Sequence, residues 1–224
     1  MDCAQRAANL DLKSETLNFN HKNMIRSMLV VAVCMFVLVA ASPVRMGYEV
    51  GDTVADFKLK NTNGKMVALS DYKDVKGVIV IFDCNTCPYS KAYNDRILAL
   101  GKKYSKTFPL ILVQSNDPEK SPGDSYDAMV KYAEDHGYDF PYLFDETQNV
   151  ARNFGATNTP HAFVLKKEGA AFKVVYIGAI DDNARDAAAV TKRYVEDAVD
   201  AVTSNKAAAT TKTKAIGCTI KWAD

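Results

Sequence analysis

The chain has 224 residues, and its 28 Lys and Arg residues nearly balance its 27 Asp and Glu residues, which gives a net charge of +1. Such a balance gives no basic surplus of the kind that marks a nucleic-acid-binding protein. The apolar content of 48% is that of an ordinary globular protein.

The first 41 residues have the composition of an export signal. Lys22 and Arg26 supply positive charge, and the uninterrupted apolar run 28–41 follows. A run of this length is short for a bilayer span, which needs ~20 residues, and small residues at its end suit a cleavage site. We therefore expect an exported protein, periplasmic or extracellular, with a leader at 1–41 and a linker at 42–50. An uncleaved membrane anchor is the alternative, and Met24 is an alternative start.

The rest of the chain predicts alternating strands and helices. Continuous apolar runs indicate strands buried on both faces of a sheet, and apolar residues at helical spacing indicate amphipathic helices. The expected order is a pair of short strands around a turn within 51–69, a strand at 78–82, a helix at 89–104, a strand at 108–113, a loop at 114–125, a helix at 126–136, a short strand at 140–144, a helical turn at 147–154, a hairpin of 162–165 and 172–177, and a helix at 186–202.

This order predicts one α/β domain over 51–204, with a central mixed sheet flanked by helices and an N-terminal β-hairpin extension. Residues 205–224 begin as a low-complexity segment and end in the motif 217–222. We expect this stretch to be a flexible tail.

Cys84 and Cys87 lie between the strand at 78–82 and the helix at 89–104. The unpaired N–H groups and the dipole at a helix start stabilise a thiolate, which is the reactive form of cysteine. We expect a redox-active dithiol in which Cys84 is the more exposed nucleophile and Cys87 resolves the mixed disulfide.

Two other interpretations of the pair remain open. The cysteines can form a structural disulfide or stay as inert buried thiols. A zinc site would need four ligands, and only Cys218 and His161 are available to complete one. We expect neither a metal nor an organic cofactor.

Asp83 and Lys91 flank the dithiol. Asp83 can raise the pKa of a thiol or carry a proton, or it can be a helix-capping or solvated side chain. Lys91 can favour a thiolate, or it can be a solvated lysine.

Thr159 and Pro160 precede the predicted hairpin. A cis bond between them would place the Thr159 backbone beside the dithiol, where it could pair with an extended substrate, although an isolated X-Pro bond is usually trans. His161 follows, either as a group that titrates near the site or as a half-exposed bystander.

Cys218 lies fifteen residues beyond Thr203, a length that spans up to about 50 Å when extended. It can therefore return to the dithiol as a second resolving thiol. It can also be a small buried residue beside Trp222, or the partner in an intermolecular disulfide.

Five segments together resemble the thioredoxin superfamily, in particular its peroxiredoxin-like redoxin branch of AhpC/TSA type. They cover most of the chain from Gly51 to Trp222 and are 51–57, 82–93, 140–148, 155–160 and 217–222. The resemblance implies a thioredoxin-like fold, a cis Pro160 and a dithiol at the edge of the sheet.

Several positions depart from the family pattern. Asn158 stands where relatives often have a cysteine, and His161 where they often have an acid. A peroxidase would have Thr or Ser three residues before its reactive cysteine, where Ile81 stands here, and an arginine that is absent around Ala162. Without those donors a peroxide bond is poorly polarised.

We therefore predict an exported thiol–disulfide oxidoreductase whose partners are proteins or small molecules that carry thiols or disulfides. A thiol peroxidase is the first alternative. A non-catalytic binding protein with a structural disulfide is the second, because a fold alone does not imply an activity.

Overall fold

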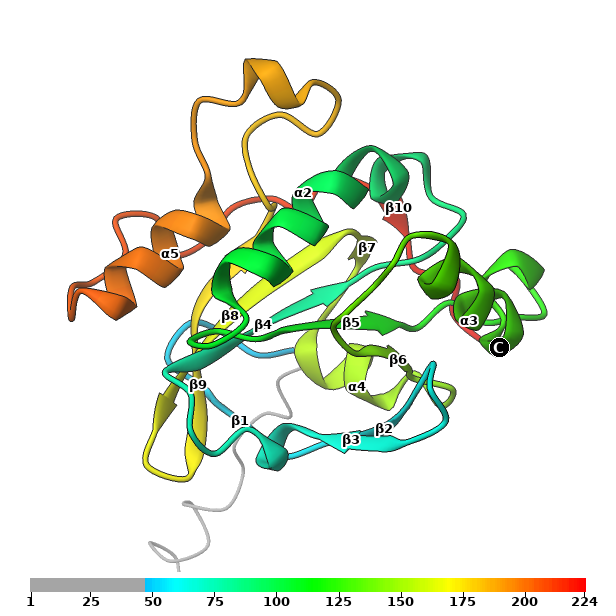
Figure 1. The fold of residues 1–224 in the computed structure, drawn as a ribbon, viewed down its shortest axis with the longest axis horizontal. Coiled ribbons are helices and arrows are strands. Elements are labelled where there is room, and N and C mark those ends of the chain that lie inside the picture. The colour runs from blue at the N-terminus through cyan, green and yellow to red at the C-terminus, as the bar shows by residue number, and fades with distance from the viewer. Residues whose placement is uncertain (1–46) are drawn as a thin grey trace, which may run out of the picture. The chain divides into compact units, whose positions relative to one another are not determined.

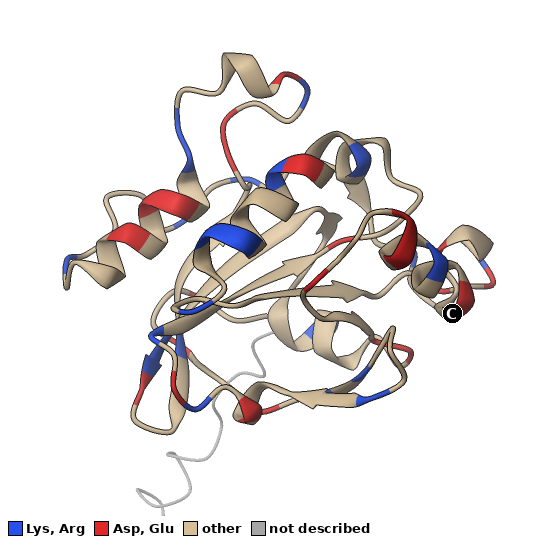
Figure 2. Cartoon of the chain, in the orientation of Figure 1, with Lys and Arg blue, Asp and Glu red and all other residues tan. Residues whose placement is uncertain are grey.

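The computed structural model describes residues 47–224. The expected leader at 1–41 and most of the expected linker at 42–50 lie outside these residues. Within them, no helix is both long and apolar enough to cross a membrane. Acidic and basic residues are both spread over the fold in Figure 2, in keeping with the balanced charge of the sequence.

The centre of the fold is a mixed sheet of eight strands in the order β1-β9-β8-β4-β5-β6-β2-β3 (Figure 1). The pairs β4–β5 and β5–β6 are parallel, and all the other neighbours are antiparallel. The strands are β1 (Thr53–Val54), β2 (Lys58–Asn61), β3 (Met66–Ala68), β4 (Gly77–Phe82), β5 (Leu110–Gln114), β6 (Tyr142–Phe144), β8 (His161–Glu168) and β9 (Ala171–Gly178). The expected mixed sheet and the N-terminal hairpin, formed by β2 and β3, are confirmed.

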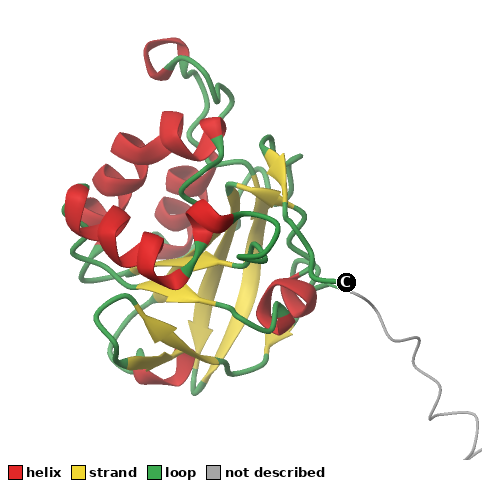
Figure 3. Ribbon diagram, turned by 90° about the vertical axis from the view of Figure 1, so that its right-hand side faces the viewer, coloured by secondary structure: helices red, strands yellow, loops and turns green. Residues whose placement is uncertain are grey.

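Helices cover both faces of the sheet (Figure 3). On one face, Ile79 and Leu112 pack in a core with residues of α2 (Pro88–Tyr104), α3 (Tyr126–Asp135) and α5 (Tyr194–Thr203). On the other face, Val80 and Phe82 pack with residues of α4 (Asn149–Phe154). Every residue of β4 and β5 is buried, because both faces of these strands are covered.

The last helix differs from the expectation: it begins at Tyr194 instead of 186. Short polar side chains before it bond to their own backbone. The Asn183 side chain accepts from the backbone N–H of Arg185 and Asp186, and the Asp186 carboxylate accepts from that of Ala188. These bonds compete with a helix, which apolar spacing alone does not reveal.

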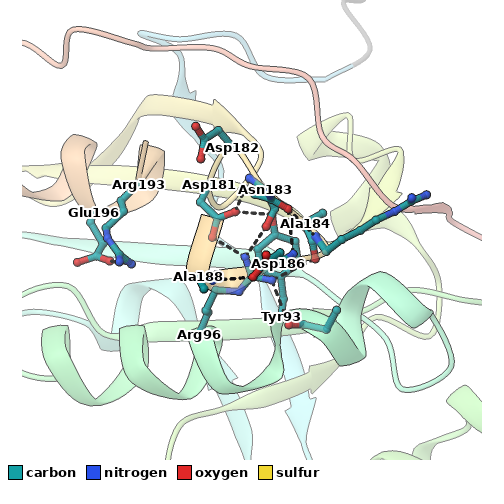
Figure 4. Close-up of polar contacts among 12 residues, drawn as sticks. Tyr93, Arg96, Asp181, Asp182, Asn183, Ala184, Asp186, Ala188, Arg193 and Glu196 are labelled. Carbon is teal, nitrogen blue, oxygen red and sulfur yellow. Dashed lines mark hydrogen bonds and ion pairs between the residues drawn. The ribbon is translucent and has the colours of Figure 1, made fainter. Parts of the chain in front are cut away.

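Arg96 of α2 holds this loop against the domain (Figure 4). Its guanidinium lies 2.7 Å from an Asp181 carboxylate oxygen and donates to the backbone carbonyls of Asn183 and Ala184. The Tyr93 hydroxyl donates to the other Asp181 oxygen at 2.8 Å. The loop is therefore fixed by a buried ion pair at its first turn.

The C-terminal segment, which we define as residues 211–224, is docked on the domain, contrary to the flexible tail that we expected. It begins beside β9, where Ile177 N–H donates to Thr211 and Thr213 N–H donates to Ile177. It then passes the start of α2 and ends near α3, as the red trace in Figure 1 shows. On the way it forms β10 (Cys218–Thr219), which pairs with β7 (Asn158–Thr159) in a separate two-stranded sheet.

Candidate functional site

The two cysteines lie where β4 ends and α2 begins, as the sequence predicts. Cys84 follows β4 by two residues, and Cys87 directly precedes the first helical residue, Pro88. Proline suits this first position because the N–H that it lacks would have no partner inside the helix. The arrangement puts Cys87 at the positive end of the α2 dipole.

A buried carboxylate that the sequence analysis missed fixes the two residues between the cysteines. Asp124 Oδ1 accepts from the backbone N–H groups of Asn85 at 2.8 Å and Thr86 at 3.1 Å. Its Oδ2 accepts from the Thr86 hydroxyl at 2.7 Å and from the Asn116 amide at 2.9 Å. The loop 114–125 showed only turn-forming residues, and nothing in the sequence marked which of its acids would be buried at this site.

The Thr159–Pro160 bond is cis, as the family resemblance implied. Thr159 contacts both cysteines: its Oγ1 lies 3.1 Å from Cys84 Sγ, and its carbonyl oxygen lies 3.1 Å from Cys87 Sγ. The structure therefore brings together the four residues that the sequence analysis placed in the catalytic and binding roles.

A third thiol completes the cluster. Cys218 Sγ lies 2.8 Å from Cys87 Sγ, and Cys218 is the register partner of Thr159 in the β10–β7 pair. The three cysteines of the described residues are all free thiols in this structure.

The contacts among the thiols separate their pKa values. A hydrogen bond from Cys84 lowers the pKa of Cys87 to about 4; burial opposes this shift, and contacts with Cys218 and the Ser90 backbone add to it. The same hydrogen bond, together with burial, raises the pKa of Cys84. Burial and the bond to Cys87 raise the pKa of Cys218 to about 11. In the reduced site the negative charge therefore resides on Cys87.

Asp83 is a buried carboxyl beside the dithiol, not a capping or solvated one. It is 4% exposed, and its Oδ1 has no hydrogen-bond partner in the part of the chain that the structure describes. Burial raises its pKa from 3.8 to about 7, and the Cys87 charge adds to this rise. The group can therefore gain or lose a proton near neutral pH.

The two other accessory candidates do not join the cluster. The Lys91 side chain is exposed and makes no hydrogen bond or ion pair with any residue of the described range 47–224. His161 is buried in β8, where it accepts from the Thr157 N–H, and burial lowers its pKa to about 4. It is therefore neither half-exposed nor titratable near neutral pH. Among residues 47–224 no three His, Cys, Asp or Glu side chains are grouped to hold a metal ion.

The expectation that Cys84 would be the more exposed cysteine is wrong, because both cysteines are only 2% exposed. Two immediate neighbours, Thr86 and Pro88, are exposed, so the site lies just below the surface.

Comparison with known proteins agrees with this description. The model of the AhpC/TSA family matches residues 50–176. Thiol–disulfide oxidoreductase ResA of Bacillus subtilis (strain 168) is 29% identical over 153 residues, which are 66% of this chain and 80% of that protein. The protein of the same name from Geobacillus thermodenitrificans is 26% identical over 129 residues, 56% of this chain and 68% of its own.

Solved structures show the same fold. An uncharacterized conserved protein from Geobacillus kaustophilus is 33% identical, with a TM-score of 0.73 over 82% of this chain and 98% of its own. A hypothetical protein from Sinorhizobium meliloti 1021 is 31% identical, with a TM-score of 0.73 over 79% of this chain and 96% of its own. The expected thioredoxin-like fold is confirmed.

Proposed function

The chain belongs to the AhpC/TSA family, and on this premise we propose that it is a thiol–disulfide oxidoreductase that cycles Cys84 and Cys87 between a dithiol and a disulfide. The observation that carries the proposal is the geometry of the pair: Cys84 and Cys87 lie at a strand-to-helix junction, and Thr159, which precedes a cis proline, contacts both sulfurs. The lowered pKa of Cys87 supports it. A low-pKa thiol is a good leaving group in disulfide exchange. A pair of inert structural thiols would not need this separation of charge.

The separated pKa values assign different roles to the two sulfurs. When a substrate thiolate attacks the disulfide at Cys84, the bond to Cys87 breaks and Cys87 leaves as the stabilised thiolate. In the reverse direction the Cys87 thiolate attacks the mixed disulfide at Cys84 and releases the substrate. Cys84 is thus the sulfur that bonds to substrate, and Cys87 is the resolving thiol.

Asp83 serves as the proton reservoir of this exchange. When Cys84 attacks a substrate disulfide, its proton passes to Cys87 along the hydrogen bond between them. Cys87 must then lose that proton before it can resolve the mixed disulfide. A carboxyl with a pKa of about 7, close enough to interact with the Cys87 charge, is suited to accept it.

Substrates are proteins or small molecules with thiols or disulfides. An extended peptide can pair with the backbone of Asn158 and Thr159, as an added strand does in other peptide-binding folds. We place the protein outside the cytoplasm, periplasmic or extracellular, from the positive and apolar segments that precede residue 42.

The test is the reduction of insulin disulfides by the protein, with dithiothreitol as the electron donor. The reaction is followed by the turbidity of the insulin chains that precipitate when they are reduced. Wild type is expected to accelerate the reaction, whereas Cys84→Ser and Cys87→Ser are not. Failure of the wild type in this assay and in exchange with glutathione disulfide would overturn the proposal. Rapid, saturable consumption of hydrogen peroxide without dithiol exchange would instead assign a peroxidase.

A further inference from the structure

The β10 strand lies on the edge where the proposed substrate peptide would pair. Cys218 faces Thr159 and Thr219 faces Asn158 in an antiparallel register. The Asn158 amide donates to the Gly217 carbonyl at 2.9 Å, and the Ile220 N–H donates to the Thr157 carbonyl at 3.0 Å. The chain therefore places its own end where a substrate strand would add to the fold.

Gly217 allows this strand to lie directly on the cis-proline turn. A Cβ at position 217 would overlap the Thr159 carbonyl and contact Pro160 N. Any larger residue must push the strand away from the dithiol. The close approach of β10 to Thr159 therefore depends on glycine at position 217.

Anchors on both sides hold the strand in place. Upstream, the Thr213 hydroxyl accepts from Ala179 N–H at 2.9 Å. Downstream, Lys221 N–H donates to the Asn116 side chain at 2.9 Å, and the Lys221 carbonyl accepts from Asp117 N–H at 2.8 Å. Cys218 is therefore positioned against Cys87 by the fold, and not by a chance contact of a loose tail.

We propose that Cys218 is a third redox thiol of this site, which forms a disulfide with Cys87 while its strand occupies the substrate edge. The inference rests on the proposed function, because the electrons leave the site through exchange with a substrate disulfide. The sulfurs of Cys87 and Cys218 are 2.8 Å apart, and a disulfide bond is about 2.05 Å long. A small movement therefore suffices to join them.

The step is an internal exchange without net oxidation. The Cys218 thiolate attacks Cys87 in the Cys84–Cys87 disulfide; the bond between Cys87 and Cys218 forms, and the bond to Cys84 breaks. The electron pair leaves on Cys84, which takes up the proton that Cys218 has lost. The Thr159 hydroxyl, 3.1 Å from Cys84 Sγ, can donate a hydrogen bond to the departing thiolate.

The product is an oxidised form of the protein in which Cys87 and Cys218 share the disulfide, Cys84 is a free thiol, and β10 is covalently linked to the dithiol site. Both active-site thiols are 2% exposed with the strand in place. Because β10 pairs with β7, a substrate strand that pairs with Thr159 must displace β10, and a Cys87–Cys218 bond would prevent that until it is reduced or reversed by Cys84.

The test uses Cys84→Ser, in which the usual disulfide cannot form. The variant is treated with glutathione disulfide at low protein concentration, quenched with acid and alkylated, and its peptides are identified by mass spectrometry. We expect a monomeric disulfide between the Cys87 and Cys218 peptides, whose formation releases two glutathione molecules besides any released at Cys3 and Cys34. A glutathione adduct on Cys87 with Cys218 free, or a dimer joined through Cys218, would overturn the inference.

The role of β10 is tested by introducing Gly217→Val into the Cys84→Ser variant. Thr219→Val in the same variant is the matched control, because Thr219 is an exposed residue of β10. Gly217→Val is expected to slow formation of the Cys87–Cys218 bond about tenfold or more, because the thiol is no longer held in place; Thr219→Val is expected to leave it unchanged. If Gly217→Val does not fold, Asn158→Ala removes one strand contact and is expected to give a smaller slowing. Equal rates in the folded strand variants and their parent would refute the role of the strand.

These results are separable from the proposed function. If wild type reduces insulin but Cys84→Ser forms no Cys87–Cys218 disulfide, the proposed oxidoreductase function is supported and the proposed redox role of Cys218 is refuted. If the internal bond forms but wild type exchanges with no substrate, the disulfide is structural and both proposals fail.

Discussion

Replacing Asp83 with asparagine is expected to stabilise the folded protein at pH 8 and to have little effect at pH 4. The folded-state pKa of this buried carboxyl is raised from 3.8 to about 7. Between pH 3.8 and about pH 7, Asp83 has lost its proton in the unfolded chain and keeps it in the folded chain. The stability of the wild type therefore falls as pH rises through this window.

The size of the effect follows from the two pKa values. A tenfold change in an equilibrium is worth about 1.4 kcal/mol, so a rise from 3.8 to about 7 corresponds to about 4 kcal/mol. Because Asp83 is fully buried, solvent does not screen this cost. Asparagine carries no charge at any pH and has nearly the same shape.

The assay is urea unfolding of the reduced proteins at intervals between pH 4 and pH 8. The difference in unfolding free energy between Asp83→Asn and wild type should grow in favour of the variant up to about pH 7 and then level off. The same pair of measurements in a Cys87→Ser background controls for the thiolate charge that contributes to the shift. A difference that does not change with pH would refute the raised pKa.

Three further substitutions test other contacts of the site and of the loop beside α2. Cys87→Ser should abolish the thiolate absorbance at 240 nm that appears near pH 4 in the reduced wild type; its persistence would place the charge on another sulfur. Asp124→Asn should cost about 2 to 4 kcal/mol in thermal or urea unfolding, because buried donors lose a charged acceptor; an unchanged stability would contradict its anchoring role. Arg96→Ala should cost about 3 kcal/mol by leaving Asp181 buried without its partner. Arg96→Ala should also make residues 181–193 the first site of proteolysis. The control is Lys131→Ala, which removes an exposed ion pair and should change the free energy of unfolding by less than about 0.5 kcal/mol. Equal losses of stability in the two variants would be evidence against a contribution from the buried pair.

The sequence predicted the features that depend on local pattern. The apolar run of β4 and the helical spacing of α2 placed Cys84 and Cys87 at a strand-to-helix junction. The family resemblance supplied what local physics leaves open, namely the cis bond before Pro160.

The features that the sequence did not predict arise from contacts between distant segments. Asp124 is 38 residues from Thr86, whose backbone it holds, and no periodic pattern marks such a pair. The low-complexity composition after Thr203 suggested a loose tail, yet Thr213 and Lys221 bond to the domain. The contacts of Cys84 and Cys87 with Thr159, more than 70 residues away, are of the same kind, and the low exposure of the two cysteines was not predicted either.

The cluster of Cys84, Cys87 and Cys218 has an odd number of sulfurs. One disulfide within this cluster joins two of the three sulfurs and leaves the third free. Among residues 47–224 the number of free thiols would therefore fall from three to one, whichever pair is joined. Only the identity of the remaining free thiol would differ: Cys218 of β10 if Cys84 and Cys87 are joined, and Cys84 of the loop before α2 if Cys87 and Cys218 are joined.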